Sequence, residues 1–142
     1  MDKKYRIGYI AGVFDLFHVG HLNLLENAKS YCNYLIVGVL SDKLVVHFKV
    51  KPPVISCAER MRIIESIKCV DEAVEVTLEN IDKVEAWKKY HFDCLFSGDD
   101  YKDNPVWIAD KKRLNELGSN IEFFPYTKSI STTMIKSKMG EE

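Results

Sequence analysis

The chain has 142 residues, of which 46% are hydrophobic and 29% are charged, and its formal net charge at pH 7 is −1. This length suits one domain that buries a core without disulfide or metal staples. A net charge this close to zero shows no broad excess of basic residues, which argues against a dedicated nucleic-acid binder, so we expect no nucleic-acid partner. No run approaches the ~18 apolar residues of a membrane span, and no apolar stretch of signal-peptide length follows the first residues. We therefore expect a cytoplasmic protein with no membrane partner.

Four cysteines are spread along the chain without a C-x-x-C pair: Cys32, Cys57, Cys69 and Cys94. Their spacing fits no common metal site. Three of them lie in runs that predict helix or strand, where a reduced cysteine acts as a small apolar residue. The pattern indicates core residues in a reducing compartment.

Hydrophobic periodicity predicts that strands and helices alternate along the whole chain. Strands are expected at 6–11, 34–40, 73–76, 94–96 and 121–124, and helices at 20–31, 57–68, 80–90, 107–117 and 132–138. The run Tyr34–Leu40 is apolar on both faces, as strands inside a parallel sheet are. The alternation predicts an α/β fold, a single Rossmann-like doubly wound domain over residues 1–142 with a mainly parallel five-stranded sheet.

Two local signals set boundaries in the middle of the chain. Ser56 followed by Glu59 is a capping box, which predicts a helix start at Cys57. Residues 42–55, which contain Pro52-Pro53, are predicted to form a long loop between the second strand and that helix.

The tetrad His18-Val19-Gly20-His21 stands where the first strand gives way to the first helix. Free N–H groups and the helix dipole make such a junction an anion site. The two histidines, three residues apart, project to one side, and Gly20 leaves the backbone open to a phosphate. Taken alone, the tetrad also fits a surface pair or half of a metal site. Zinc is disfavoured, because His47 and His91 are isolated and no cysteine lies at ligand spacing.

Polar segments follow the carboxyl ends of four predicted strands, where doubly wound sheets bind their ligands. These segments are Gly12–His21, Ser41-Asp42, Gly98-Asp99-Asp100 and Ile130–Thr133. Because parallel strands end at one edge of a sheet, we expect the four loops to form one composite pocket.

The segment Gly12–His21 resembles the signature of the cytidylyltransferase-like branch of the HxGH nucleotidyltransferases. Further segments agree with that family in order: Ser56–Arg60 with Lys68–Glu72, Ser97–Asp100 and Ile130–Thr133. The resemblance spans Tyr9 to about Lys136 and is closest in length and motif order to the small glycerol-3-phosphate cytidylyltransferases. The chain also resembles the choline- and ethanolamine-phosphate cytidylyltransferases.

The resemblance implies an enzyme that couples CTP to a small phosphorylated alcohol, most simply glycerol 3-phosphate, and releases pyrophosphate. Such a transfer asks the protein mainly for alignment and for positive charge. By this resemblance His18 and His21 would hydrogen-bond the α-phosphate and the leaving oxygen. Lys49 would act with them as a catalytic cation. Mg²⁺ is expected as cofactor, bound mainly through the triphosphate, so no side chain is assigned as a metal ligand.

The remaining site residues are also implied by the resemblance. Those expected at the nucleotide are Gly12, Val13, Phe14, Asp15, Gly20, Asp99, Asp100, Ile130, Ser131, Thr132 and Thr133. Those expected at the acceptor or its phosphate are Lys51, Arg60, Tyr126 and Lys128. Ordinary alternatives stay open: solvated lysines at 49 and 51, an exposed arginine at 60, and a helix N-cap at Ser131. Relatives of this length imply a homodimer.

Tyr126-Thr127-Lys128-Ser129 departs from the family's Arg-Thr-Glu-Gly. A tyrosine hydroxyl supplies neither the charge nor the donor fork of a guanidinium. Either Lys128 compensates, or the acceptor or the base differs. The alternatives are an adenylyltransferase of the same fold, a choline- or ethanolamine-phosphate cytidylyltransferase, and a nucleotide-sensing domain with a degenerate site.

Overall fold

The computed structural model describes residues 3–125 of the 142-residue chain. The elements are β1 (Tyr5–Gly12), α1 (Val19–Tyr31), β2 (Cys32–Leu40), α2 (Asp42–Lys49), α3 (Cys57–Glu65), β3 (Glu72–Val76), α4 (Lys83–Tyr90), β4 (Cys94–Gly98), the 3₁₀ turn η1 (Asp99–Tyr101), α5 (Pro105–Glu116) and β5 (Asn120–Phe124). Over residues 3–125 no helix combines the length and apolar character needed to cross a membrane. The expected helix at 132–138 lies outside the described residues.

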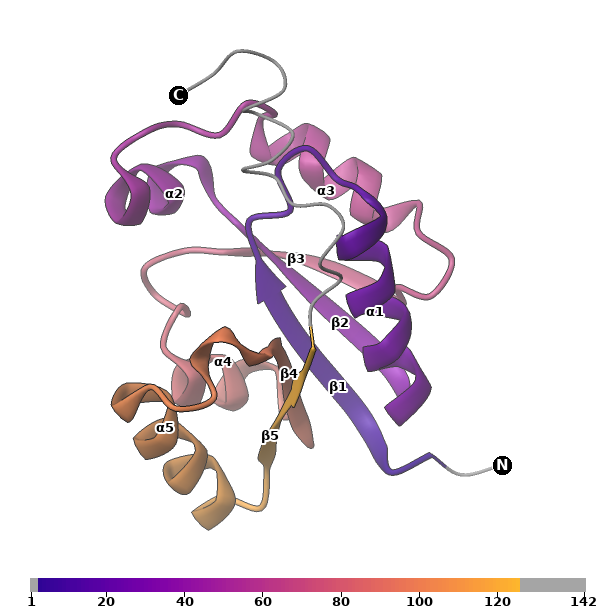
Figure 1. Ribbon diagram of the computed structural model, residues 1–142, viewed down its shortest axis with the longest axis vertical. Coiled ribbons are helices and arrows are strands. Elements are labelled where there is room, and N and C mark those ends of the chain that lie inside the picture. The colour runs from indigo at the N-terminus through magenta and orange to yellow at the C-terminus, as the bar shows by residue number, and fades with distance from the viewer. Residues whose placement is uncertain (1–2, 126–142) are drawn as a thin grey trace.

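The five strands form one sheet in the order β3-β2-β1-β4-β5, and every neighbouring pair is parallel. Helices α1 and α3 lie on one face of this sheet, and α4 and α5 lie on the other (Figure 1). The predicted α/β, Rossmann-like, doubly wound fold is confirmed. The chain starts in the middle of the sheet at β1 and winds outward in both directions. The strand order therefore reverses between β1 and β4, which is where such sheets bind ligands.

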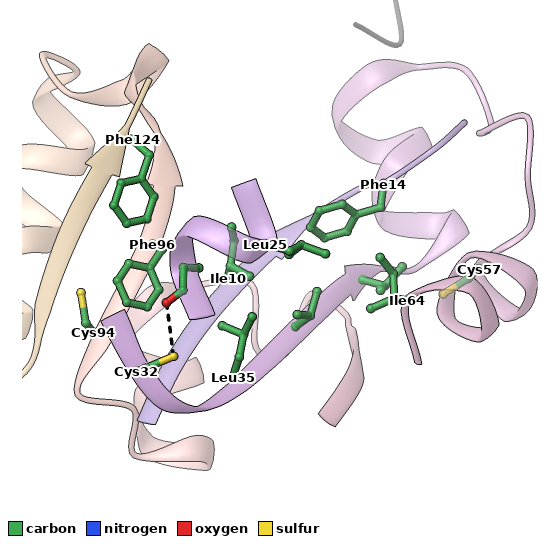
Figure 2. Packing of buried hydrophobic residues seen from close by; sticks show 13 residues of the cluster. Ile10, Phe14, Leu25, Cys32, Leu35, Cys57, Ile64, Cys94, Phe96 and Phe124 are labelled. Atoms are coloured by element: carbon green, nitrogen blue, oxygen red, sulfur yellow. Dashed lines mark hydrogen bonds between the residues drawn. The ribbon is translucent and has the colours of Figure 1, made fainter. Parts of the chain in front are cut away.

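Alternating side chains of the central strands fill two hydrophobic layers. Ile10, Leu35 and Phe96 pack under α1 and α3 (Figure 2), while Tyr9, Ile36 and Leu95 pack under α4 and α5. The two-sided apolar run in β2 is thus buried on both faces, as its sequence indicates. The cysteines are all unpaired; Cys32, Cys57 and Cys94 are buried and Cys69 is partly buried, which confirms their core role.

The predicted loop at 42–55 is wrong over its first half, because Asp42–Lys49 forms α2. The Ser41 hydroxyl accepts a hydrogen bond from the Leu44 N–H at 3.1 Å and caps this helix. Leu44 and Val45 anchor α2 in the interior. The eight-residue helix contains only about two turns, too short for periodicity to stand out beside the two prolines that follow.

Three other helix boundaries shift for identifiable reasons. Helix α4 begins at Lys83 rather than at residue 80, because Asp82 is its N-cap. Helix α5 begins two residues earlier than expected, with Asn104 as N-cap and Pro105 in the first turn. Helix α3 ends at Glu65 instead of Lys68, since the next residues form tighter turns.

Candidate active site

The histidine turn, residues 12–21, joins the carboxyl end of β1 to α1. It follows β1, the sheet neighbour of β4, and so lies at the point where the strand order reverses. The loops after β1, β2 and β4 leave the same edge of the parallel sheet, as predicted. The fourth predicted loop, Ile130–Thr133, lies outside the described residues, together with Tyr126 and Lys128.

His18 and His21 cap the N-terminus of α1 reciprocally. The Gly20 N–H donates to His18 Nδ1 at 3.0 Å, and the His18 N–H donates to His21 Nδ1 at 3.2 Å. The two rings lie 4.0 Å apart between centroids. A neutral imidazole that accepts at Nδ1 carries its proton at Nε2. We therefore assign a free Nε2–H donor to each histidine at the positive end of the helix dipole.

The surroundings keep both imidazoles neutral. Burial lowers the pKa of His21 from 6.5 to about 4, with the neighbouring His18 acting in the same direction and Asp15 in the opposite one. Burial also lowers the pKa of His18 below its usual value. At neutral pH this pair presents hydrogen-bond donors without net charge, so charge for a polyanion has to come from other residues.

Asp15 and the residues beside it give the turn its shape. Phe14 and Leu16 adopt left-handed backbone angles, with φ of 55° and 51°. The Asp15 side chain is buried, and its carboxylate accepts hydrogen bonds from the Val54 N–H at 2.7 Å and the Ile55 N–H at 2.9 Å. A left-handed residue on each side turns Asp15 inward, where it fixes the chain that leads into α3.

Gly12 and Phe14 pack behind the histidines, on the side of the protein interior. The Phe14 ring is buried and meets the His21 ring edge-on, with 5.6 Å between centroids. A Cβ at Gly12 would lie 3.1 Å from the Phe14 ring, tighter than ordinary contacts. Glycine thus lets the phenylalanine fold back beneath His21. Side chains predicted to bind nucleotide at 14 and 15 are directed into the protein, so this stretch can offer a ligand its backbone.

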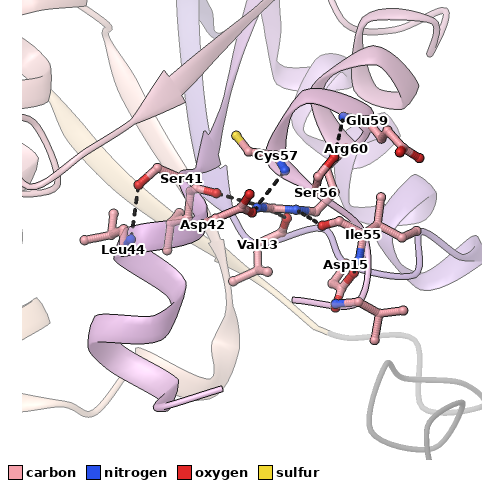
Figure 3. A network of polar contacts seen from close by, with 12 residues as sticks. Val13, Asp15, Ser41, Asp42, Leu44, Ile55, Ser56, Cys57, Glu59 and Arg60 are labelled. Carbon is pink, nitrogen blue, oxygen red and sulfur yellow. Dashed lines mark hydrogen bonds and ion pairs between the residues drawn. The ribbon is translucent and has the colours of Figure 1, made fainter. Parts of the chain in front are cut away.

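Arg60 is buried, with 1% of its surface exposed, so the alternative of an ordinary surface arginine is wrong. Its guanidinium donates to the carbonyls of Val13 at 2.7 Å, Leu40 at 2.9 Å and Ile55 at 2.8 Å. It also forms an ion pair with Asp42 Oδ1 at 2.6 Å (Figure 3). These contacts use four of the five N–H groups of an arginine, and the side chain has no exposed surface.

The predicted cations and the two aspartates of the Gly-Asp-Asp segment are exposed. Lys49 is the last residue of α2, and Lys51 follows Val50, which ends the helix in a left-handed conformation. Asp99 and Asp100 lie on η1, directly after the buried end of β4. Among residues 3–125, no three histidine, cysteine or acidic side chains come together as a metal site.

Asp42 is the residue that the sequence argument missed. Its Oδ1 accepts from Arg60 Nη2 and, at 3.0 Å, from the Cys57 N–H. The position of Ser41-Asp42 at the end of a strand pointed to this edge of the sheet, but not to its buried partner. A serine followed by an aspartate is also a helix-start signal, and reading it so would have found α2.

Fold and site together define a Rossmann-like protein with the N-terminus of α1 at the reversal point of its sheet, a position suited to an anion. A lipopolysaccharide core biosynthesis protein from Thermoplasma volcanium GSS1 has a similar structure, with a TM-score of 0.70, 24% identity and coverage of 89% of this chain and 99% of that one. The sequence model of the cytidylyltransferase-like family matches residues 9–138. The chain belongs to the cytidylyltransferase-like family of nucleotidyltransferases.

Relatives within the family differ in their named activities. The glycerol-3-phosphate cytidylyltransferase of Bacillus spizizenii is 36% identical, with 91% of this chain and 93% of the relative covered. The FAD synthase of Thermococcus sibiricus is 31% identical, with 89% and 85% covered. The bifunctional protein HldE of Geobacter metallireducens is 34% identical over 96% of this chain, which spans 28% of that relative's length.

Proposed function

We propose that this protein transfers CMP from CTP to a small phosphorylated alcohol, with glycerol 3-phosphate as the preferred acceptor, and releases pyrophosphate. The observation that carries the proposal is the pair of neutral Nε2–H donors of His18 and His21 at the N-terminus of α1. Similarity to a glycerol-3-phosphate cytidylyltransferase over nearly the whole of both chains supports the choice of substrates.

The proposed transfer needs alignment and charge but no covalent enzyme intermediate. An oxygen of the acceptor phosphate attacks the α-phosphorus of CTP, and the bond from that phosphorus to the bridging oxygen breaks. The electron pair leaves with pyrophosphate, and the ionised acceptor needs no general base. His18 and His21 donate to the α-phosphate and to the bridging oxygen, where negative charge grows. Because both imidazoles are neutral, Lys49 supplies the cationic stabilisation.

The other site residues fall into two groups. Gly20 and the backbone of the histidine turn lie at the phosphates, and Asp99 and Asp100 border the nucleotide. Mg²⁺ is expected mainly on the triphosphate oxygens and would supply positive charge for the leaving group; the exposed carboxylates of η1 are hard oxygen ligands of the kind it prefers. Lys51 serves the acceptor phosphate. The roles expected of Tyr126, Lys128 and Ile130–Thr133 stay predictions, as does the homodimer.

Adenylyl transfer is the second candidate, because a FAD synthase is similar over 85% of its own length. A pyrophosphate-release screen separates the two. CTP, ATP, UTP and GTP are each combined with glycerol 3-phosphate, phosphocholine and phosphoethanolamine, and ATP also with riboflavin phosphate, in the presence of Mg²⁺. We expect release with CTP and glycerol 3-phosphate, absent in a His18→Ala/His21→Ala control. Release only with ATP would replace the proposal, and nucleotide binding without turnover on any pair would indicate a sensing domain.

A further inference from the structure

Arg60 joins three stretches of chain that are distant in the sequence. Its guanidinium bonds the carbonyl of Val13 in the histidine turn, the carbonyl of Leu40 at the end of β2, and the carbonyl of Ile55 before α3. Its fourth bond goes to Asp42, the first residue of α2 (Figure 3). One side chain therefore touches the turn that carries the histidines and both ends of residues 42–55, here termed the lysine segment.

Two carboxylates complete the same junction. Asp42 Oδ1 accepts from Arg60 and from the Cys57 N–H, so the two ends of the lysine segment meet at one oxygen. Asp15, in the histidine turn, accepts from the N–H groups of Val54 and Ile55. The segment that carries Lys49 and Lys51 is thus fixed at its start and at its end, and both anchors lead back to the histidine turn.

Stability alone does not explain an arginine at this place. The Arg60 side chain is fully buried, whereas 49% of the Asp42 side chain is exposed. Burying a guanidinium removes its hydration, and an apolar side chain of similar size often stabilises a protein as well or better. What arginine adds is a rigid planar fork that holds several acceptors in fixed directions. Here three of the four acceptors belong to the two parts of the proposed active site: Val13 to the histidine turn, and Asp42 and Ile55 to the lysine segment.

We propose that Arg60 is a positioning residue for nucleotidyl transfer, which sets the lysine segment relative to the histidine turn and does not itself bind substrate phosphate. This inference rests on the proposed function and assigns Arg60 a role different from that of a phosphate ligand. Because Arg60 bonds both Asp42 and the backbone of the histidine turn, it fixes the position of α2, and with it Lys49, relative to that turn. The imidazole donors of His18 and His21 and the cation of Lys49 are then held in a fixed arrangement.

The variants that test it are Arg60→Lys, Arg60→Met and Asp42→Ala. Lysine keeps the charge but cannot reach four acceptors, methionine fills the volume without hydrogen bonds, and Asp42→Ala removes the acceptor from a half-exposed position. Arg62→Lys, on the exposed face of α3, is the matched control. We expect the three test variants to lower kcat about tenfold or more with KM for CTP and acceptor nearly unchanged. The control should behave like the wild type. A large rise in KM with kcat retained would instead make Arg60 a phosphate ligand and overturn the proposal.

A double-mutant cycle with Lys49→Ala separates positioning from general damage. If Arg60 acts through the lysine segment, Arg60→Lys should lose much less activity in the Lys49→Ala background than in the wild type. Losses that multiply in the double variant would overturn the proposal, because they mean that the two residues act independently.

Trypsin cleavage after Lys49 gives a readout that needs no activity. Trypsin does not cleave the bond after Lys51, because Pro52 follows it. Cleavage of the Lys49–Val50 bond therefore reports on the exposed part of the segment. We expect faster cleavage there in Arg60→Met and Asp42→Ala than in Arg62→Lys, and equal rates would overturn the proposal. A wild type inactive in every substrate pair would remove the proposed function, while the cleavage rates would still decide whether Arg60 fixes the segment.

Discussion

The histidine turn and the lysine segment are built in opposite ways. In the turn, both imidazoles are engaged at Nδ1, Asp15 is buried, and two left-handed residues fix the backbone. In the lysine segment, both ends are held by hydrogen bonds and Leu44 and Val45 are buried, but residues 46–51 are exposed, up to 83% at Val50.

The difference follows from the physics of the two kinds of group. A neutral hydrogen-bond donor acts only at close range and in the right direction, so it has to be held rigidly. A charge acts over a longer distance and tolerates an imprecise position. The proposed site thus places its directional groups on the ordered turn and its charges on an exposed segment.

Removal of either imidazole should give the largest loss. We expect His18→Ala and His21→Ala each to lower kcat by ~10²–10³, as loss of a preorganised donor does, in steady-state assays with CTP and glycerol 3-phosphate. His18→Asn separates capping from catalysis, because asparagine is a good N-cap but lacks the distant Nε2–H. It should keep the melting temperature of the wild type and still lose the rate.

His91→Asn is the matched control for these variants. His91 ends α4 in a left-handed conformation that asparagine tolerates, far along the chain from the histidine turn. It should retain full activity. Rates within threefold of the wild type for both His18→Ala and His21→Ala would remove the histidine turn from the mechanism.

The lysines should give the next largest loss, without a cost in stability. Lys49→Ala is expected to lower kcat by ~10², and Lys51→Ala mainly to raise KM for the acceptor. Because both side chains are exposed, unfolding free energies should stay within ~0.5 kcal/mol of the wild type by urea denaturation. A loss of unfolding free energy well above ~0.5 kcal/mol in Lys49→Ala would contradict the contrast between the two regions.

The sequence predicted the parts of this molecule that depend on local periodicity and motif. The apolar run of β2 and the position of the histidine tetrad both indicated a parallel sheet with a site at its carboxyl edge. Ser56 predicted the start of α3 within one residue, because capping is a local interaction. Helix α2 was predicted as a loop, because a helix of two turns gives little periodic hydrophobic pattern.

The surroundings of Arg60 could not be predicted in the same way. Its partners are mainly backbone carbonyls, which any residue type supplies, so Val13, Leu40 and Ile55 carry no sequence sign of the contact. Asp42 is the one partner with a charged side chain, and eighteen positions separate it from Arg60. Only the winding of the sheet brings the ends of β1 and β2 together with the start of α3.

Acid should destabilise the histidine turn specifically. The pKa of His21 is lowered from 6.5 to about 4, so the unfolded chain binds its proton more readily than the folded one. Unfolding free energy should therefore fall as pH drops from about 6.5 towards 4, and this contribution should level off below that range. Protonation also removes the Nδ1 lone pair that accepts the His18 N–H. In His21→Gln, urea denaturation between pH 4 and 7 should show a shallower slope; an unchanged slope would assign the acid sensitivity to other groups.

The smallest expected effect concerns the strained end of α2. Val50 has a φ of 68° and is largely exposed, so a β-branched residue occupies the left-handed region without burial to compensate. Glycine adopts this conformation without a Cβ penalty, whereas alanine does not, so Val50→Gly should be more stable than Val50→Ala by up to ~1 kcal/mol. Val46, exposed within α2, is the matched site: there alanine should be the more stable by ~1 kcal/mol, because glycine weakens a helix interior. The measured quantity is the difference in unfolding free energy between the glycine and alanine variants, obtained by urea denaturation. Opposite signs of this difference at Val50 and Val46 would establish that the lysine segment turns sharply between Lys49 and Lys51. Equal signs would mean that the helix continues through Val50, and the exposed turn that carries the two cations would then have to be given up.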